Sequence, residues 1–352
     1  MKKGFSYINF ILITLFFIPN LFGKDIEPEK SKIIPDLIRP RYMDIDNKRI
    51  YIVENRVKIK GFSMETFEKN FEISTRRGQG PGEFPWAPAI IASDKNIFVK
   101  TTTKIAKYTK KGEYINEHKL KGRGIIYPFG KNYVFWYFHF DKKTKKQYII
   151  VDLINSKNKR LKRVFTFKQK RFLPLSMITT KRSKGKVFLL GSERASITVS
   201  ENKIFVLEPE KIIKLEIFNL NGELIKTVGK IDISKIKITP EDKLELMENW
   251  KYIEGFSENK WEEFKKRYEF LHPEFFPRFK EIIVDQDNIY IKTYKSKKRM
   301  KEFLVYDFNG KLKKNIFLPE SKIWKIKDGK YYYLSFSDEE EEWLLYRINI
   351  KL

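Results

Sequence analysis

Side chains with a broad catalytic repertoire are scarce in this chain of 352 residues, which has three histidines and no cysteine. His118, His139 and His272 each lack a second ligand at metal-binding spacing, and no Gly-x-Ser-x-Gly elbow, His-Glu-x-x-His helix or EF-hand loop occurs. The lack of cysteine excludes a thiol nucleophile, Cys-ligated zinc, an iron–sulfur cluster and a lipid anchor on cysteine. The sequence therefore predicts no catalytic residue, no metal site and no cofactor.

Three aspartates offer the remaining route to metal chemistry. Asp44, Asp46 and Asp285 could meet around a calcium ion if the fold brought them together, which would favour a metal-dependent hydrolase or lyase at the mouth of a central channel. Aspartate at a turn also accepts backbone N–H bonds, and this explains Asp46 without a metal. Both interpretations stay open on sequence alone.

The charge balance points to an anionic partner. Lysine and arginine number 72 and aspartate and glutamate 45, which gives a net charge of +27. The lysine clusters fall at expected turns and hairpin tips, within residues 142–146, 157–163, 168–171, 181–186 and 295–301. A compositional bias towards lysine would place them there, and so would a basic surface that attracts an acidic protein, a polysaccharide or a lipid surface.

The N-terminus has the pattern of a secretory signal peptide. Met1-Lys2-Lys3 precedes the apolar run 10–18, and Pro19 and Gly23 follow it, so cleavage is expected after Gly23. The run is shorter than the ~20 residues of a spanning helix, although an uncleaved anchor is the alternative. No later segment is apolar enough to span a bilayer. A periplasmic, outer-surface or secreted location is expected, and nucleic acid is not expected as a partner.

A pattern of short apolar strands and polar turns recurs six times. Its clearest copy spans residues 90–118, with a hairpin turn at Lys110–Glu113, and Asn221-Gly222 and Asn309-Gly310 mark the same turn in later copies. Weaker copies lie within residues 41–74, 124–167 and 323–350. A four-stranded unit with two apolar faces needs neighbours on both sides. The pattern thus predicts an all-β, six-bladed β-propeller of four-stranded antiparallel blades.

Two insertions and one closure complete the predicted domain, which spans residues 24–352. An extra hairpin is expected at about 172–195, turning at Ser183-Lys184-Gly185. A helical insertion is expected at about 239–271, with caps at Thr239 and Ser257 and an end at Leu271-His272-Pro273. The last repeat supplies only three strands. Residues 32–38 are expected to add the fourth and so close the ring.

One segment resembles a known family. Gly78-Gln79-Gly80-Pro81-Gly82-Glu83-Phe84, which leads into the strand at Ile90, is similar to the connection between blades in NHL-type six-bladed β-propellers, and Phe275–Phe279 is similar to another segment of those proteins. From about Arg41 to Leu352 the chain resembles the exported bacterial propellers of this type. The resemblance implies a scaffold, since many of these proteins have no assigned activity.

The same loop has a physical explanation of its own. Gly78, Gly80 and Gly82 allow a left-handed backbone and Pro81 stiffens the loop. Glu83 can accept backbone N–H bonds, and Phe84 can pack between two blades. A phosphate-binding loop would need Gly-Lys-Ser/Thr before a helix, whereas a strand follows here. The loop is therefore predicted to be structural.

Strand order suggests which residues would contact a partner. In the resembling family, the connections between blades share one face of the ring with those between second and third strands. The contacts predicted on that face are Arg76, Arg77, Trp86, Glu54, Asn55, Arg56, Lys100, Thr101, Tyr294 and Lys295. The aromatic cluster between Tyr133 and Phe140 is expected in the core rather than at a sugar-binding surface. We therefore expect an exported, monomeric, non-enzymatic scaffold that binds a protein or an anionic envelope partner.

Overall fold

The computed structural model describes residues 28–34, 37–54, 58–85, 88–120, 122–144, 146–169, 185–188, 195–200, 202–209, 213–254 and 256–352. The predicted signal peptide and the turn at Ser183-Lys184 lie outside these residues. No helix among them is long and apolar enough to cross a membrane.

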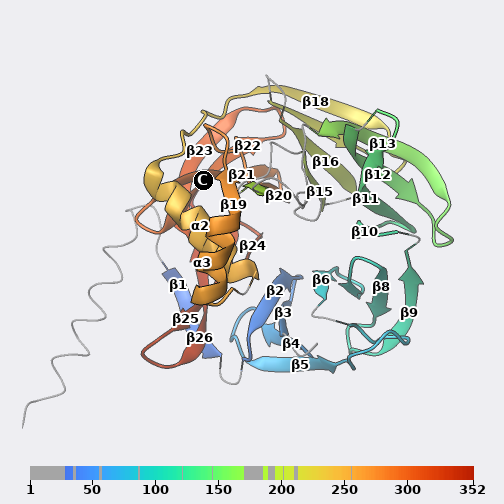
Figure 1. The fold of residues 1–352 in the computed structure, drawn as a ribbon. Helices are drawn as coiled ribbons and strands as arrows, with labels where there is room; N and C mark the ends of the chain where they lie inside the picture. Colours follow the sequence, from blue (N-terminus) through green and yellow to red (C-terminus); the bar gives the residue numbers. More distant parts are fainter. Residues whose placement is uncertain are drawn as a thin grey trace, which may run out of the picture. The chain divides into compact units, whose positions relative to one another are not determined.

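Six antiparallel sheets of four strands confirm the all-β, six-bladed β-propeller (Figure 1). The first three sheets contain β2 (Pro40–Ile45), β3 (Arg49–Glu54), β4 (Lys58–Ser63) and β5 (Lys69–Ser74); β6 (Ala89–Ala92), β7 (Ile97–Lys100), β8 (Lys104–Tyr108) and β9 (Tyr114–Lys119); and β10 (Ile125–Phe129), β11 (Asn132–Asp141), β12 (Lys146–Ile154) and β13 (Arg160–Gln169). The next two contain β15 (Ser196–Ser200), β16 (Lys203–Glu208), β17 (Ile213–Phe218) and β18 (Leu224–Ile231); and β20 (Glu281–Asp285), β21 (Asn288–Lys297), β22 (Met300–Asp307) and β23 (Leu312–Pro319).

The sixth sheet joins the two ends of the chain. Its order is β1 (Pro28–Ile34), β26 (Glu342–Asn349), β25 (Lys330–Ser337) and β24 (Trp324–Lys327), so the blue β1 lies beside the red β26 in Figure 1. Ile34 pairs with Trp343 and Ser31 with Tyr346. The expected closure by an N-terminal strand is thus present, although the strand ends at Ile34 and leaves Leu37 and Ile38 beyond it.

The chain divides into two compact units. Unit 1 runs to Gly122 and includes Ser296–Lys301 and Ile316–Leu352, and unit 2 consists of Arg123–Lys295 with Glu302–Asn315. In each unit, neighbouring sheets share apolar cores. One core of unit 1 combines Tyr51 and Phe71 of the first sheet with Val99 and Tyr108 of the second. Alternation along each strand explains this arrangement, because successive side chains point to opposite faces of a sheet.

The turns follow their local sequence. Asp46 Oδ1 accepts the N–H groups of Lys48 and Arg49 at 2.7 and 2.8 Å, which closes the link between β2 and β3. Gly112, Gly222 and Gly310 have positive φ at the predicted hairpin turns. Glycine adopts this conformation without the steric cost that a Cβ would bring.

The helical insertion is present as two helices, α2 (Pro240–Glu254) and α3 (Glu258–Arg267). Thr239 caps α2 reciprocally: its Oγ1 accepts the Asp242 N–H at 3.1 Å, and Asp242 Oδ2 accepts the Thr239 N–H at 2.8 Å. Ser257 occupies the N-cap position of α3 but makes no side-chain capping bond. The helix ends at Arg267, earlier than expected. The next residues form β19 (Tyr268–Leu271), which pairs in parallel with β14 (Gly185–Phe188).

Candidate functional site

Two charges of unit 1 meet on the first strands of two sheets, Asp44 on β2 and Lys325 on β24. β2 contacts both β6 and β24, and Asp44 of β2 reaches both of them. Its Oδ1 accepts a hydrogen bond from Lys325 Nζ at 2.6 Å, and its Oδ2 accepts the Ala92 N–H at 2.8 Å. Asp44 is only 6% exposed, so its charge is held by one ammonium group and one peptide N–H.

A second lysine shares this carboxylate. Burial of Lys100, at the end of β7, lowers the pKa of its ammonium group to about 7; the charge of Asp44 opposes this shift and the charge of Lys325 adds to it. The pKa of an ordinary lysine is about 10.4. Asp44, Lys100 and Lys325, called the Lys100 cluster below, thus combine two basic groups with one carboxylate, and burial makes Lys100 a weaker base than an ordinary lysine.

The pairing register explains why this cluster stands out. Asp44 lies opposite Tyr51 and Lys325 opposite Tyr332, so the two occupy the same position in adjacent sheets. The corresponding residue of β6 is Ile91, opposite Phe98. Asp44, as a channel carboxylate, and Lys100, as a contact, are among the residues predicted from the sequence, whereas Lys325 is not. Lys325 could be found from the sequence, because it is charged at a position where another repeat has the apolar Ile91.

A buried ion pair holds the loop Gly78–Phe84, which carries the family resemblance. Lys104 Nζ lies 2.9 Å from Glu117 Oε2 and donates to the Gly80 carbonyl at 2.8 Å, and the same Glu117 oxygen accepts the Gly82 N–H at 3.1 Å. Both side chains of the pair are less than 10% exposed. Phe84 is fully buried in the core between the first two sheets of unit 1. These contacts explain the loop as a structural element.

Two of the three loop glycines act differently from the prediction. Only Gly82 has a positive φ, of 68°. Gly78 and Gly80 instead leave room for the Glu83 carboxylate, whose Oε2 would lie 2.1 and 3.0 Å from a Cβ at these positions. Glu83 Oε2 accepts the Gly80 N–H at 3.0 Å. Glycine is therefore required at positions 78 and 80 because the Glu83 carboxylate lies too close to admit a Cβ, and not because the backbone is left-handed there.

The predicted contact residues of unit 1 fall into two groups. Arg76 and Arg77 are exposed, and Arg77 Nε donates to the Pro85 carbonyl at 3.1 Å. Lys100 pairs with Ala89, the residue at which β6 begins after the loop. Glu54 and Thr101 are buried instead. Glu54 Oε1 is bound by Lys60 Nζ at 2.9 Å and by the Ile38 N–H at 2.7 Å, so it serves the fold.

The remaining predicted contacts lie elsewhere or outside the described residues. In unit 2, Tyr294 stacks on Phe276 with ring centres 4.9 Å apart, and Lys295 Nζ lies 3.1 Å from Glu302 Oε1. Asn55, Arg56 and Trp86 are outside the described residues. The structure therefore brings Asp44, Lys100 and Lys325 together in unit 1, and Arg76 and Arg77 are exposed in the same unit.

Other buried carboxylates are engaged by cations or hydroxyl groups. Asp46 binds Lys110 and accepts the Tyr51 hydroxyl at 2.7 Å. Burial alone would raise the pKa of Asp46, but the hydrogen bonds from Lys110, Lys48, Tyr51 and Arg49 outweigh it and lower the pKa. In the described part of the chain, no three His, Cys, Asp or Glu side chains come together as a metal site would require.

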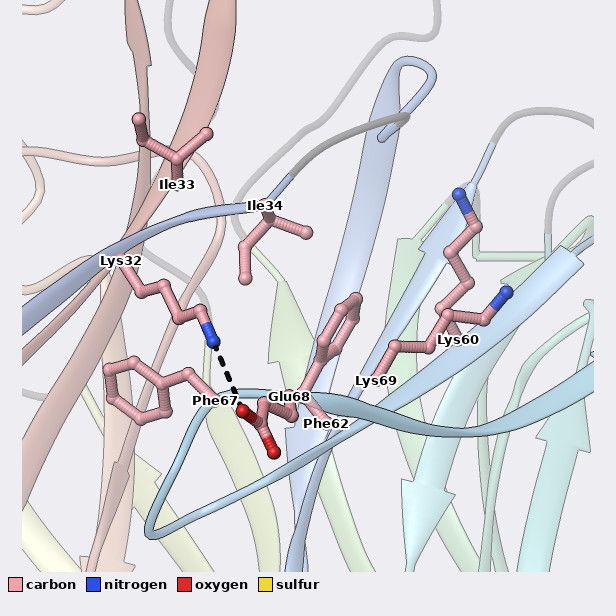
Figure 2. A pocket seen from close by; sticks show the side chains of 8 residues that line it. All are labelled: Lys32, Ile33, Ile34, Lys60, Phe62, Phe67, Glu68 and Lys69. Carbon is pink, nitrogen blue, oxygen red and sulfur yellow. Dashed lines mark ion pairs between the residues drawn. The ribbon is translucent and has the colours of Figure 1, made fainter.

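A cavity of about 240 Å³ lies between β1 and the β4–β5 hairpin (Figure 2). Ile34, Phe62 and Phe67 supply apolar walls. The charged groups around it have partners: Lys32 lies 3.8 Å from Glu68, Lys60 binds Glu54 and Lys69 binds Glu72. Because these charges are compensated within the fold, we assign the cavity to the packing of β1 and not to a ligand.

The comparisons with known proteins add little to this description. No family model and no curated protein matches the sequence. The chain is similar to a solved structure described as "Crystal structure of the computationally designed Ika8 protein: crystal packing No.1 in P63", with 8% identity, 92% of this chain and 99% of that chain covered, and a TM-score of 0.40. A similarity of this degree carries no argument, so the assignment of a six-bladed β-propeller rests on the strand pairing itself.

Proposed function

We propose that this chain is an exported, non-enzymatic scaffold of the NHL-repeat type that binds a carboxylate-rich partner of the cell envelope at the Lys100 cluster. The N-terminal signal pattern supports export. The loop Gly78–Phe84 supports the NHL type, and the net charge of +27 supports an anionic partner.

The observation that carries the proposal is the desolvated ammonium group of Lys100 beside Asp44 and Lys325. Lys325 and Lys100 share this one carboxylate, and desolvation makes protonation of Lys100 costly. An incoming carboxylate beside Lys100 would favour its ammonium form. A hydrogen bond between two charged groups is stronger than one between neutral groups. The cluster is thus suited to a single anionic group, while Arg76 and Arg77 can attract the rest of an acidic polymer.

Charge reversal of the exposed arginines tests the proposal. With immobilised alginate as a carboxylate-rich probe, Arg76→Glu with Arg77→Glu is expected to weaken binding by about tenfold at low salt, since each exposed charge contributes roughly 0.2–1 kcal/mol and reversal doubles the effect. The thermal midpoint should stay unchanged, because both side chains are exposed.

The matched control reverses exposed cations of unit 2, with Lys260→Glu and Lys266→Glu on α3. These changes alter net charge equally and should weaken binding less than twofold. Equal losses in both variants would mean that the probe senses net charge only, and the proposed site would be wrong.

A further inference from the structure

An extended hairpin in unit 2 carries exposed aromatic side chains next to lysines. β11 and β12 pair as far as Asp141 opposite Lys146, and β13 follows β12 as far as Gln169 opposite Gln147. Phe138 and Phe140 lie near the end of β11 and are 47% and 48% exposed. The sequence predicts this aromatic cluster in the core, and these two members depart from that prediction.

The two phenylalanines share one face of the sheet. Residues 134, 136, 138 and 140 alternate to the same side, and Val134 and Trp136 on that side belong to the core shared with the β15–β18 sheet. Phe138 stands edge-on to Trp136, with ring centres 5.8 Å apart. Towards the tip, the same row of side chains leaves the core and meets solvent. Burial of this exposed apolar surface against another surface would be favourable.

Positive charge gathers at the same end of the sheet as the two rings. Exposed lysines of the hairpin and of the end of β13 are Lys142, Lys143, Lys146 and Lys168. The acidic group at the described tip is Asp141, and it closes the turn: its carboxylate accepts the Lys143 N–H at 2.9 Å and the Thr144 hydroxyl at 2.6 Å. These hydrogen bonds lower the pKa of Asp141, the Thr144 hydroxyl most. Lys142 and Lys143 follow Phe140 in the turn, whereas Lys146, opposite Asp141, and Lys168, opposite Tyr148, point to the other face of the sheet. Four lysines thus lie at this end of the sheet beside one aspartate whose carboxylate is bound locally.

We propose that this hairpin tip, formed by Phe138, Phe140, Lys142, Lys143, Lys146 and Lys168, docks on an anionic lipid surface. Apolar rings inserted at the level of the headgroups, with lysines beside anionic lipids, combine the two terms that hold peripheral proteins on membranes. An acidic protein would satisfy the lysines, but the exposed rings would need a matching apolar pocket. The lipid surface offers both parts at once. This inference does not depend on the proposed function, since the Lys100 cluster belongs to unit 1.

Vesicle sedimentation tests the inference with the full mature chain. We expect binding to vesicles of phosphatidylglycerol and phosphatidylcholine, and little binding to phosphatidylcholine alone. Phe138→Ser with Phe140→Ser should reduce the partition coefficient at least tenfold. Lys142→Gln, Lys143→Gln and Lys146→Gln together should reduce it by about a hundredfold at low salt, since each lysine near an anionic surface contributes roughly a fivefold factor.

Control variants separate the tip from general effects. Leu161→Ser removes an equally exposed apolar side chain, 49% exposed, near the opposite end of β13, and Lys157→Gln with Lys159→Gln removes exposed lysines from the β12–β13 turn. Each should change vesicle binding less than twofold. The proposal is wrong if the phenylalanine variant binds vesicles as the parent does, or if binding ignores lipid charge. Loss of alginate binding in the tip variants without loss of vesicle binding would indicate a polysaccharide surface instead and would also overturn it.

Discussion

Replacing Lys104 by methionine is expected to lower the free energy of unfolding by about 3–5 kcal/mol. Removal of one partner leaves the Glu117 carboxylate buried without its ammonium group, and an uncompensated buried charge costs this much. The Gly80 carbonyl loses its Lys104 donor as well. Urea titration, with the slope checked for two-state behaviour, measures the loss.

Two further variants show that the pair itself is responsible. Lys119→Met removes a lysine that lies 3.8 Å from the same glutamate but is 70% exposed, and it should cost less than about 0.5 kcal/mol. Lys104→Met combined with Glu117→Met should recover much of the stability, because no buried charge is left alone. A single Lys104→Met variant as stable as the parent would contradict the view that this pair fixes the loop.

Ile34→Asp is expected to destabilise the protein by about 4 kcal/mol or more. Ile34 is 1% exposed in β1 and packs with Ile50, Phe62 and Leu345 in a core of unit 1. Deletion of a buried isoleucine costs about 2–5 kcal/mol, and burial of a carboxylate adds to that cost. Thermal and urea unfolding measure the effect, which reports how strongly the N-terminal strand holds the sixth sheet.

The neighbouring residue provides the control. Ile33 belongs to the same strand, points to the opposite face and is 40% exposed, so Ile33→Asp should cost about 1 kcal/mol or less. If the two variants were equally stable, the pairing of β1 with β26 would not be a stabilising part of the fold. If Ile33→Asp were the more destabilised variant, the strand would sit in a different register, because a shift by one residue exchanges its two faces.

The sheets could be predicted because their signals are local. Asp46 and the glycines at 112, 222 and 310 mark turns by their own backbone chemistry, and alternating apolar residues mark the strands between them. The capping box at Thr239 is equally local. The predicted end of α3 is wrong because residues 268–271 form β19 instead of continuing the helix. β19 pairs with β14, a strand far away in the sequence, and this pairing competes with helix propensity.

The candidate site depended on contacts between distant segments. Asp44, Ala92 and Lys325 come from three different sheets, and only the packing of β2 against β6 and β24 brings them together. The predicted role of Gly78 is wrong for a different reason. Its need for space comes from the Glu83 side chain, whereas the sequence pattern indicated only a flexible backbone.

The most direct test of the proposed function is the pH dependence of alginate binding. The pKa of Lys100 lies at about 7, so its protonated fraction falls about tenfold between pH 6 and pH 8 while the probe carboxylates stay ionised. The affinity of the parent should fall by up to that factor over this range. Lys100→Arg, which stays charged, should bind with little pH dependence, and Lys100→Met should bind weakly at both values. A parent whose affinity is the same at pH 6 and pH 8, or a Lys100→Met variant that binds as the parent does at pH 6, would contradict the proposal.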